Sequence, residues 1–254
     1  MGISSTNVPL ADELHTAHHT VDIDLVSEGE HQRRDIERFI KLVFRQAYGA
    51  RVNHFLPYLL SMRQDGNMLA ALGICPAVEK KLFLETYLNA PIENTLAAQL
   101  KRPIDRSSIV EVGNLSSSHG GGARALIITL TAYLSGAGYK WAVFTATPQV
   151  RNSFAKLGIE LTPLTHADKS RLGDEQHRWG NYYEQAPVVV AGNIADGTKN
   201  IRSAMSTKQL FPTAQQLWDD AENAGRQGCL WQPPHSLSDQ WPEWALEDDF
   251  DYTD

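Results

Sequence analysis

One acidic residue stands inside a stretch that is otherwise apolar. Residues 108–115 read SIVEVGNL, and Glu111 is the only charged residue among them. A carboxylate on a central strand is costly to bury unless it is paired, so Glu111 is a candidate for chemistry. As a general base it would take a proton from an amine nucleophile. The alternative is a paired structural carboxylate at a strand end. Glu85, which we expect on the neighbouring strand, is a second candidate base.

A loop of small residues follows this stretch. Residues 116–122 read SSSHGGG and lie between an expected strand and an expected helix. Such a loop points several backbone N–H groups and the positive end of the helix dipole at one place, which suits a phosphate. Three glycines would let a pyrophosphate approach the backbone closely. The loop has neither the lysine of a P-loop nor the G-x-G-x-x-G of a dinucleotide fold. His119 could contact phosphate, accept a proton or be solvated.

The elements before this centre combine helices with strands. Apolar residues at helical spacing predict a helix from Asp35 to Gly49 and a shorter helix over 52–60. Residues 68–74 (MLAALGI) and 82–88 (LFLETYL) are typical of strands, and we expect them to pair as an antiparallel hairpin. Pro91 favours a helix start, and this helix should end near Leu100.

The centre and the C-terminal half predict a β-α-β-α unit. Strand 108–115 is interrupted at Gly113, which suggests a bulge or a close backbone approach. It is followed by a buried helix over 123–135, a strand over 141–146 and a helix that Thr147 caps and that runs from Pro148 to Leu157. The two strands should lie parallel through a right-handed crossover. Residues 186–191 could add a strand, and a helix is expected around 213–224. The fold class is therefore α/β (α+β), a mixed sheet flanked by helices.

This order of elements resembles the GCN5-related N-acetyltransferase fold and the related acyl-homoserine-lactone synthases. The resemblance implies a centrally splayed sheet that admits an acyl thioester, with its pyrophosphate on the glycine loop. The family motif has Arg or Gln where this chain has Ser117 or Ser118, and often a Tyr acid near the end of the next helix, where Phe154 stands. Tyr183, or else Tyr182, is then the expected general acid. The cluster of Trp179 with these tyrosines could also be simple packing.

The resemblance also implies a set of cofactor-binding residues. The backbone near Asn114 and Leu115 would steady an oxyanion or hold the pantetheine arm, although Asn114 could equally have a turn role. Asn152 could bind the cofactor arm or cap a helix. The residues expected to hold the cofactor are Asn114, Leu115, Ser117, Ser118, His119, Gly120, Gly121, Gly122, Ala123 and Asn152. Phe39, Phe44 and Phe55 could line an acyl pocket or simply pack in the core.

A closer resemblance is to the thermostable hemolysin family. It is carried by residues 84–93 (LETYLNAPIE), 111–115 (EVGNL), 144–147 (FTAT) with 151–154 (RNSF), and 179–183 (WGNYY). It covers roughly residues 35–195. The family name suggests a membrane-active protein, but the chain shows no signal peptide, no run long enough to span a membrane and no amphipathic pore element.

The function we expect is transfer of an acyl group, for example a fatty acyl group, to a small amine such as an amino acid. The donor would be a thioester of coenzyme A or of an acyl carrier protein, and no metal is expected. Basic pairs such as Lys80–Lys81, Lys101–Arg102 and Arg33–Arg34 could dock an acidic carrier. The alternatives are a membrane-active hemolysin-type protein and a protein that binds acyl thioesters without chemistry. A homodimer is a further expectation.

Charge and composition limit the other classes. The 254 residues are 42% hydrophobic and carry a net charge of −7, which argues against nucleic acid as the partner. Six acidic and no basic residues fall within 243–254, so the rest of the chain carries −1 and that argument rests mainly on the lack of a basic cluster. Cys75 and Cys229 are expected as reduced thiols in a soluble, cytoplasmic protein. Three parts are expected: a flexible arm (1–30), the acyltransferase-like domain (31–195), and a C-terminal helix with an acidic, Trp-containing tail (196–254).

Overall fold

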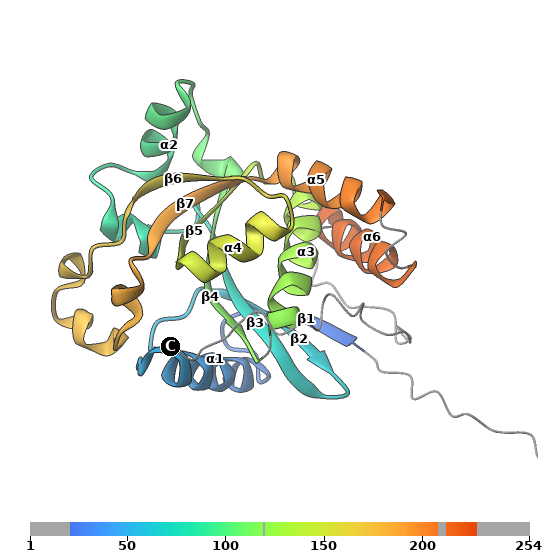
Figure 1. The fold of residues 1–254 in the computed structure, drawn as a ribbon, viewed down its shortest axis with the longest axis horizontal. Helices are drawn as coiled ribbons and strands as arrows, with labels where there is room; N and C mark the ends of the chain where they lie inside the picture. Colours follow the sequence, from blue (N-terminus) through green and yellow to red (C-terminus); the bar gives the residue numbers. More distant parts are fainter. Residues whose placement is uncertain (1–20, 119, 208–211, 228–254) are drawn as a thin grey trace, which may run out of the picture.

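A seven-stranded mixed sheet forms the centre of the computed structural model, which describes residues 21–118, 120–207 and 212–227 (Figure 1). The strands lie in the order β1-β2-β3-β4-β5-β7-β6. Their bounds are β1 Val21–Val26, β2 Tyr58–Gln64, β3 Asn67–Pro76, β4 Ile109–Ser117, β5 Trp141–Ala146, β6 Leu161–His166 and β7 Val188–Asn193. Neighbouring strands are antiparallel except β4 and β5, which are parallel as predicted. The predicted fold class, a mixed sheet flanked by helices, is confirmed.

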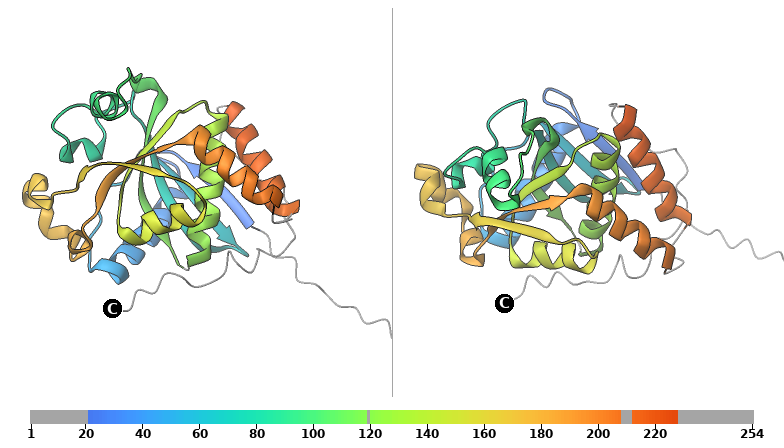
Figure 2. Two further views of the ribbon diagram at one scale, coloured as in Figure 1. Left: turned by 45° about the horizontal axis from the view of Figure 1, so that its top comes forward. Right: turned by 90° about the horizontal axis from the view of Figure 1, so that it is seen from above.

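Helices cover both faces of the sheet (Figures 1 and 2). The α-helices are α1 Arg33–Tyr48, α2 Ile92–Leu100, α3 Gly120–Gly136, α4 Pro148–Lys156, α5 Ile194–Thr207 and α6 Pro212–Gln227. Short 3-10 helices are η1 Phe83–Tyr87, η2 Arg106–Ser108, η3 Lys169–Trp179 and η4 Tyr182–Gln185. The expected cap of α4 is confirmed, because the Thr147 side chain accepts a hydrogen bond from the Val150 N–H.

Alternation along the strands assigns each helix to one face, because successive side chains of a strand point to opposite faces. On β4, Val110 and Val112 belong to the core that α3, α5 and α6 cover, whereas Ile109 packs with η1 and α2 on the other face. On β2, Leu60 belongs to the first of these cores and Leu59 packs under α1. The sheet is therefore the middle of three layers.

The sheet opens in the middle. β4 and β5 pair over only three residue pairs, which end at Glu111 and Val143, although both strands continue beyond them. The other edge of β4 carries a bulge, where Asn114 and Leu115 together face Leu72 of β3. Asn114 has a φ of 55°, a left-handed conformation that asparagine tolerates better than most residues. The predicted bulge is thus present, one residue after Gly113, and the strands diverge beside it.

Several predicted elements are wrong. Residues 58–60, expected at the end of a second helix, begin β2, and residues 82–88, expected as a strand, contain η1. The expected hairpin of 68–74 with 82–88 is therefore wrong, since β3 pairs with β2 and β4. Strand β1 lies within the expected flexible arm, and α5 and α6 belong to the main core, with Trp218 fully buried. The acidic tail lies outside the described residues.

Candidate active site

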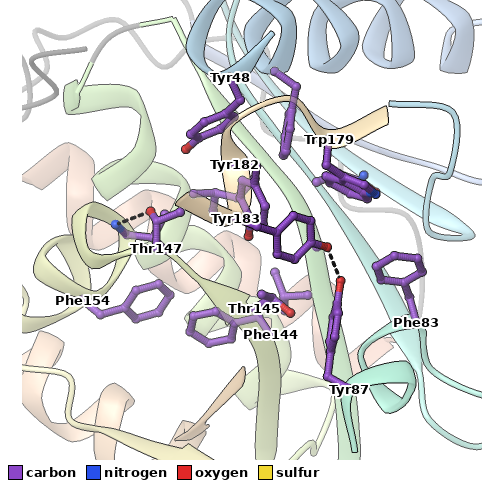
Figure 3. Close-up of a pocket in the computed structure, with 16 residues that line it drawn as sticks. Tyr48, Phe83, Tyr87, Phe144, Thr145, Thr147, Phe154, Trp179, Tyr182 and Tyr183 are labelled. Carbon is purple, nitrogen blue, oxygen red and sulfur yellow. Dashed lines mark hydrogen bonds between the residues drawn. The ribbon is translucent and has the colours of Figure 1, made fainter. Parts of the chain in front are cut away.

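A pocket occupies the opening between β4 and β5 (Figure 3). Its volume is about 80 Å³. Aromatic side chains supply much of its wall, and no charged residue is among the described residues that line it. The lining residues are Phe44, Tyr48, Phe83, Tyr87, Val112, Gly113, Asn114, Leu115, Phe144, Thr145, Thr147, Val150, Phe154, Trp179, Tyr182 and Tyr183. Because residues from both faces of the sheet line it, the pocket passes through the sheet rather than lying on one side.

Two tyrosine hydroxyls meet in this pocket. The hydroxyl of Tyr183 is hydrogen-bonded to the hydroxyl of Tyr87, as Figure 3 shows. Burial raises the pKa of Tyr183 to about 12, although the hydrogen bond with Tyr87 opposes the rise. Burial also raises the pKa of Tyr87 and of Tyr182. All three phenols are therefore protonated at neutral pH and can act as hydrogen-bond donors.

The connection between β6 and β7 brings three of these aromatic residues to the pocket. Trp179, Tyr182 and Tyr183 come from residues 167–187, and the backbone of this segment is fixed to the end of α1. Arg51 N–H donates to the Arg178 carbonyl at 2.6 Å, and Asn181 N–H donates to the Tyr48 carbonyl at 2.9 Å. A Cβ at Gly180 would lie 1.9 Å from the Tyr48 oxygen, so only glycine allows this approach.

Glu111 lies behind the pocket wall and not on it. The residue is 4% exposed, and its two side-chain oxygens accept hydrogen bonds from the backbone N–H groups of Phe83, at 2.8 Å, and Leu84, at 2.9 Å. Burial raises the pKa of Glu111 to about 7 against the lowering effect of these two hydrogen bonds. Glu111 therefore holds the first turn of η1, whose Phe83 and Tyr87 line the pocket.

Glu85 also has structural partners. Its carboxylate accepts hydrogen bonds from the N–H groups of Leu82 and Ile92 and forms an ion pair with Arg106 at 2.7 Å. Burial would raise the pKa of Glu85, but the Arg106 guanidinium and the two N–H donors outweigh this effect and lower it. Glu85 joins η1 to the start of α2, and it does not line the pocket between the strands.

The bulge residues do reach the pocket, although the Asn114 amide is already bonded. Its Oδ1 accepts from the Leu56 N–H at 3.2 Å and its Nδ2 donates to the His54 carbonyl at 3.1 Å. This arrangement supports the turn role for the Asn114 side chain. Gly113 and Leu115 line the pocket beside it.

The expected glycine loop is shorter than predicted. Ser116 and Ser117 are buried residues of β4, and Gly120, Gly121 and Gly122 form the first turn of α3 rather than a loop. The hydroxyl of Ser118 donates to the Leu69 carbonyl at 3.0 Å. His119 lies outside the described residues, and Ala123 is in α3. β4 ends at Ser117 and α3 begins at Gly120, and the first N–H groups of a helix are a general type of anion-binding site.

Other candidates divide between the pocket and the rest of the fold. Asn152 is exposed on α4 and is not among the pocket residues. Phe44 lines the pocket, whereas Phe39 and Phe55 pack around α1. Sequence reasoning missed Tyr48, Phe83 and Tyr87. The one signal for Tyr87 was its place in the LETYL motif; Tyr48 and Phe83 had none beyond their helical or alternating spacing.

In the described ranges, every helix is too short or too polar to cross a bilayer. Among these same residues there is no cluster of three His, Cys, Asp or Glu side chains that could hold a metal ion.

Comparisons with known proteins agree with this architecture. A family model described as thermostable hemolysin matches residues 26–198. The structure of FeeM, an N-acyl amino acid synthase from uncultured soil microbes, superposes with a TM-score of 0.51 at 11% identity, over 74% of this chain and 98% of that one. BjaI, a CoA-dependent acyl-homoserine lactone synthase, gives 0.50 at 14% identity, over 74% and 89%. At such identities the likeness establishes the shared fold. A search of curated proteins finds no match.

Proposed function

The chain belongs to the thermostable hemolysin family, and we propose that it is an acyltransferase. In this proposal the donor is an acyl thioester of coenzyme A or of an acyl carrier protein, and the acceptor is a small amine such as an amino acid. The observation that carries the proposal is the uncharged, largely aromatic pocket in the opening between β4 and β5. FeeM and BjaI, whose folds are similar, are described as synthases of N-acyl amino acids and acyl-homoserine lactones.

The proposed chemistry follows from the groups around the pocket. The amine nitrogen attacks the thioester carbonyl, a C–N bond forms, the C–S bond breaks, and the proton lost by nitrogen balances the proton gained by sulfur. Tyr183, protonated at neutral pH, donates a hydrogen bond to the departing sulfur. Backbone N–H groups near Asn114 and Leu115, with the start of α3, stabilise the oxyanion and the donor's phosphates.

We place Glu111 in a positioning role. Both of its oxygens accept N–H groups of η1, and it does not line the pocket. Since no carboxylate or imidazole lines the pocket among the described residues, the amine enters as its free base. The rate at low amine concentration should then rise with pH until the pKa of the chosen amine is passed. If the pH profile instead showed one group with a pKa near 7, whichever amine was used, Glu111 would be the general base.

The direct test is release of free thiol from acyl-CoAs of graded length, with and without candidate amines. We expect release that depends on the amine. Thr145→Trp, which adds an indole to the pocket wall, should lower thioester binding at least tenfold, whereas Leu42→Trp on an exposed part of α1 should leave it unchanged. Failure of every thioester to bind or react would overturn the proposal.

Two other outcomes would favour the alternatives. Tight binding of thioesters without turnover, under all amines tried, would indicate a protein that binds acyl thioesters without chemistry. Release of a trapped dye from liposomes at low protein concentration, in the absence of any thioester, would favour a membrane-active protein.

A carrier protein as donor makes a separate prediction. Lys80 and Lys81 are exposed and, with Arg106, line a surface hollow of about 550 Å³ behind η1. Glu85 and Glu93 also line the hollow, but both are paired with Arg106, so the two lysines supply the positive charge that an acidic carrier would meet. Reversing both lysines to glutamate should lower kcat/KM for acyl-carrier donors by tenfold or more at low salt and leave the acyl-CoA reaction unchanged. An equal loss with both donors would contradict carrier docking at this hollow.

A further inference from the structure

A pair of stacked phenylalanines closes the inner end of the pocket. The rings of Phe144, on β5, and Phe154, on α4, lie 4.8 Å apart with an interplanar angle of 27°, and Figure 3 shows them facing each other beside the tyrosines. Both residues are almost fully buried, at 5% and 8% exposed. They belong to the core under α3, so they stand where the pocket meets the interior of the protein.

A second cavity begins on the other side of this pair. It is small, about 30 Å³, and its wall is almost entirely apolar. Phe144, Phe154 and Val112 line both cavities, which makes them the partition between the two. Beyond the partition the second cavity is lined by Leu130 and Leu134 of α3 and by Gly197 of α5, among others.

The chemistry of the two spaces differs along this line. The outer part of the pocket carries the tyrosine hydroxyls and the backbone of the bulge, which suit a reacting thioester. The inner part offers aromatic rings and then aliphatic side chains, with no charge to hold an amine or a carboxylate. The acyl chain is therefore the part of the substrate that would point inward, because burying its methylene groups against these apolar side chains is favourable.

We propose that the Phe144–Phe154 pair sets the acyl-chain length that the protein accepts, by separating the pocket from the second cavity. The inference rests on the proposed acyltransferase function for the identity of the ligand. Short chains end against the two rings, and longer chains are excluded because the partition does not leave space for them. Shortening Phe154 joins the cavities and provides a continuous apolar path toward Gly197.

The structure offers a way to reverse this change. A Cβ added at Gly197 would lie 3.6 Å from Thr131 Cγ2 and 3.8 Å from the Ile159 side chain, which are ordinary van der Waals distances. Gly197 lines the second cavity and does not line the first. Gly197→Val should therefore fill the second cavity without altering the site at which short chains bind.

The experiment measures binding against chain length for two ligand series, acyl-CoAs and n-alkanols from two to twelve carbons, by calorimetry. In the unmodified chain, affinity should rise about fourfold per buried methylene and then stop rising at a short length. Phe154→Ala should move this limit to longer chains in both series, and Gly197→Val on that background should move it back. Phe154→Leu serves where the alanine variant does not fold, and Phe39→Ala, away from both cavities, is the control for a lost aromatic ring.

The outcomes separate this inference from the proposed function. A shifted limit for alkanols, with no binding of any acyl-CoA and no turnover of any acyl-carrier donor, would support the partition and overturn the acyltransferase proposal. Binding of acyl-CoAs whose length limit is the same in the Phe154 variants would overturn the partition alone. A limit that moves equally in Phe39→Ala would also overturn it, because the effect would then come from a loosened fold.

Discussion

At the scale of single residues, the pocket separates side chains that can meet a ligand from those that hold the wall. Tyr183 presents its hydroxyl to the pocket, and Tyr87 is its partner. Glu111 and Glu85, the carboxylates that the sequence offers as bases, are used within the fold. A carboxylate in an apolar stretch of sequence does signal an unusual environment, but its partner was a pair of backbone amides 27 and 28 residues away.

The two candidate tyrosines can be distinguished by removing one oxygen atom at a time. Tyr183→Phe should lower kcat by about 100-fold or more, in the range typical of a lost general acid, with little change in KM. Tyr182→Phe is the matched control, since it deletes the same atom from the neighbouring ring. Because the pKa of Tyr183 is about 12, the unmodified enzyme should show no loss from phenol ionisation up to about pH 10. Equal losses in both variants would contradict the assignment.

Glu111 gives a prediction about stability and pH. Its pKa is raised in the folded state to about 7 from 4.5, so its contribution is fully present below pH 4.5 and is lost as the pH rises through 7. The loss amounts to up to about 3 kcal/mol, because each pKa unit corresponds to 1.36 kcal/mol.

Glu111→Gln should be less stable at pH 5 by about 1–3 kcal/mol, since an amide has one oxygen for two N–H donors. The deficit should shrink or reverse by pH 8, where the carboxylate is charged. Urea unfolding from pH 5 to 8 measures this difference. A deficit that stays constant with pH would show that ionisation of Glu111 does not affect folding.

At the scale of elements, the sequence predicted most accurately those helices and strands that local patterns determine. β5 and the capped start of α4 were predicted correctly, because alternation and the Thr147–Pro148 pair are local signals. Residues 82–88 alternate like a strand, yet their N–H groups are bonded by Glu111 and Glu85, which no local pattern reveals. The apolar residues of 52–60 fit the period of a helix as well as that of a strand. Strand β1 was missed although its first five residues, VDIDL, alternate between apolar and acidic, so there the signal existed in the sequence.

The same limit applies to the site. The aromatic cluster with Trp179 and Tyr183 was predicted from its own spacing, and the bulge from Gly113. Tyr48 and Phe83 join the pocket only through tertiary packing, because α1 and η1 must first be placed on the sheet. A single sequence without the fold could not bring these residues together.

The packing of α3 against α6 gives a prediction at this scale. A Cβ at Gly225 would lie 2.1 Å from the Tyr133 carbonyl oxygen, so alanine there forces the helices apart. Gly225→Ala should lower the free energy of unfolding by about 1–3 kcal/mol. Gly197→Ala, whose new methyl meets only ordinary contacts, should instead be neutral or raise it by about 0.5–1 kcal/mol. Thermal and urea unfolding of the two variants compare them directly; destabilisation by both would contradict the close approach.

At the scale of the whole molecule, the sheet is two blocks that share a short seam. β1 to β4 form one block and β5 with β7 and β6 the other, and only the three pairs that end at Glu111 and Val143 join them within the sheet. Helices, the 167–187 connection and η1 complete the walls of the opening. A ligand in the pocket would contact both blocks, so its binding would be coupled to the stability of the whole fold.

Occupancy of the pocket should therefore raise stability and slow local opening. At 100 times its dissociation constant, a thioester that binds the folded state should stabilise it by about 2.7 kcal/mol. Hydrogen exchange should slow most in residues 112–117 and 144–147, which border the opening. Exchange of β1 and β2 is the internal control and should change only with global stability. Uniform slowing over all strands would place the ligand elsewhere.

Trp179 also gives the protein a spectroscopic property. Its indole stands in the pocket wall, 5.5 Å from the ring of Tyr182 and 6.0 Å from that of Tyr183. A ligand that expels water from this wall changes the polarity around the indole, so its fluorescence emission should shift to shorter wavelength as the pocket fills. Trp141 and Trp218 are buried and do not line the pocket, and the other three tryptophans lie outside the described residues. The difference between the unmodified chain and Trp179→Phe would then report binding without a label on either partner.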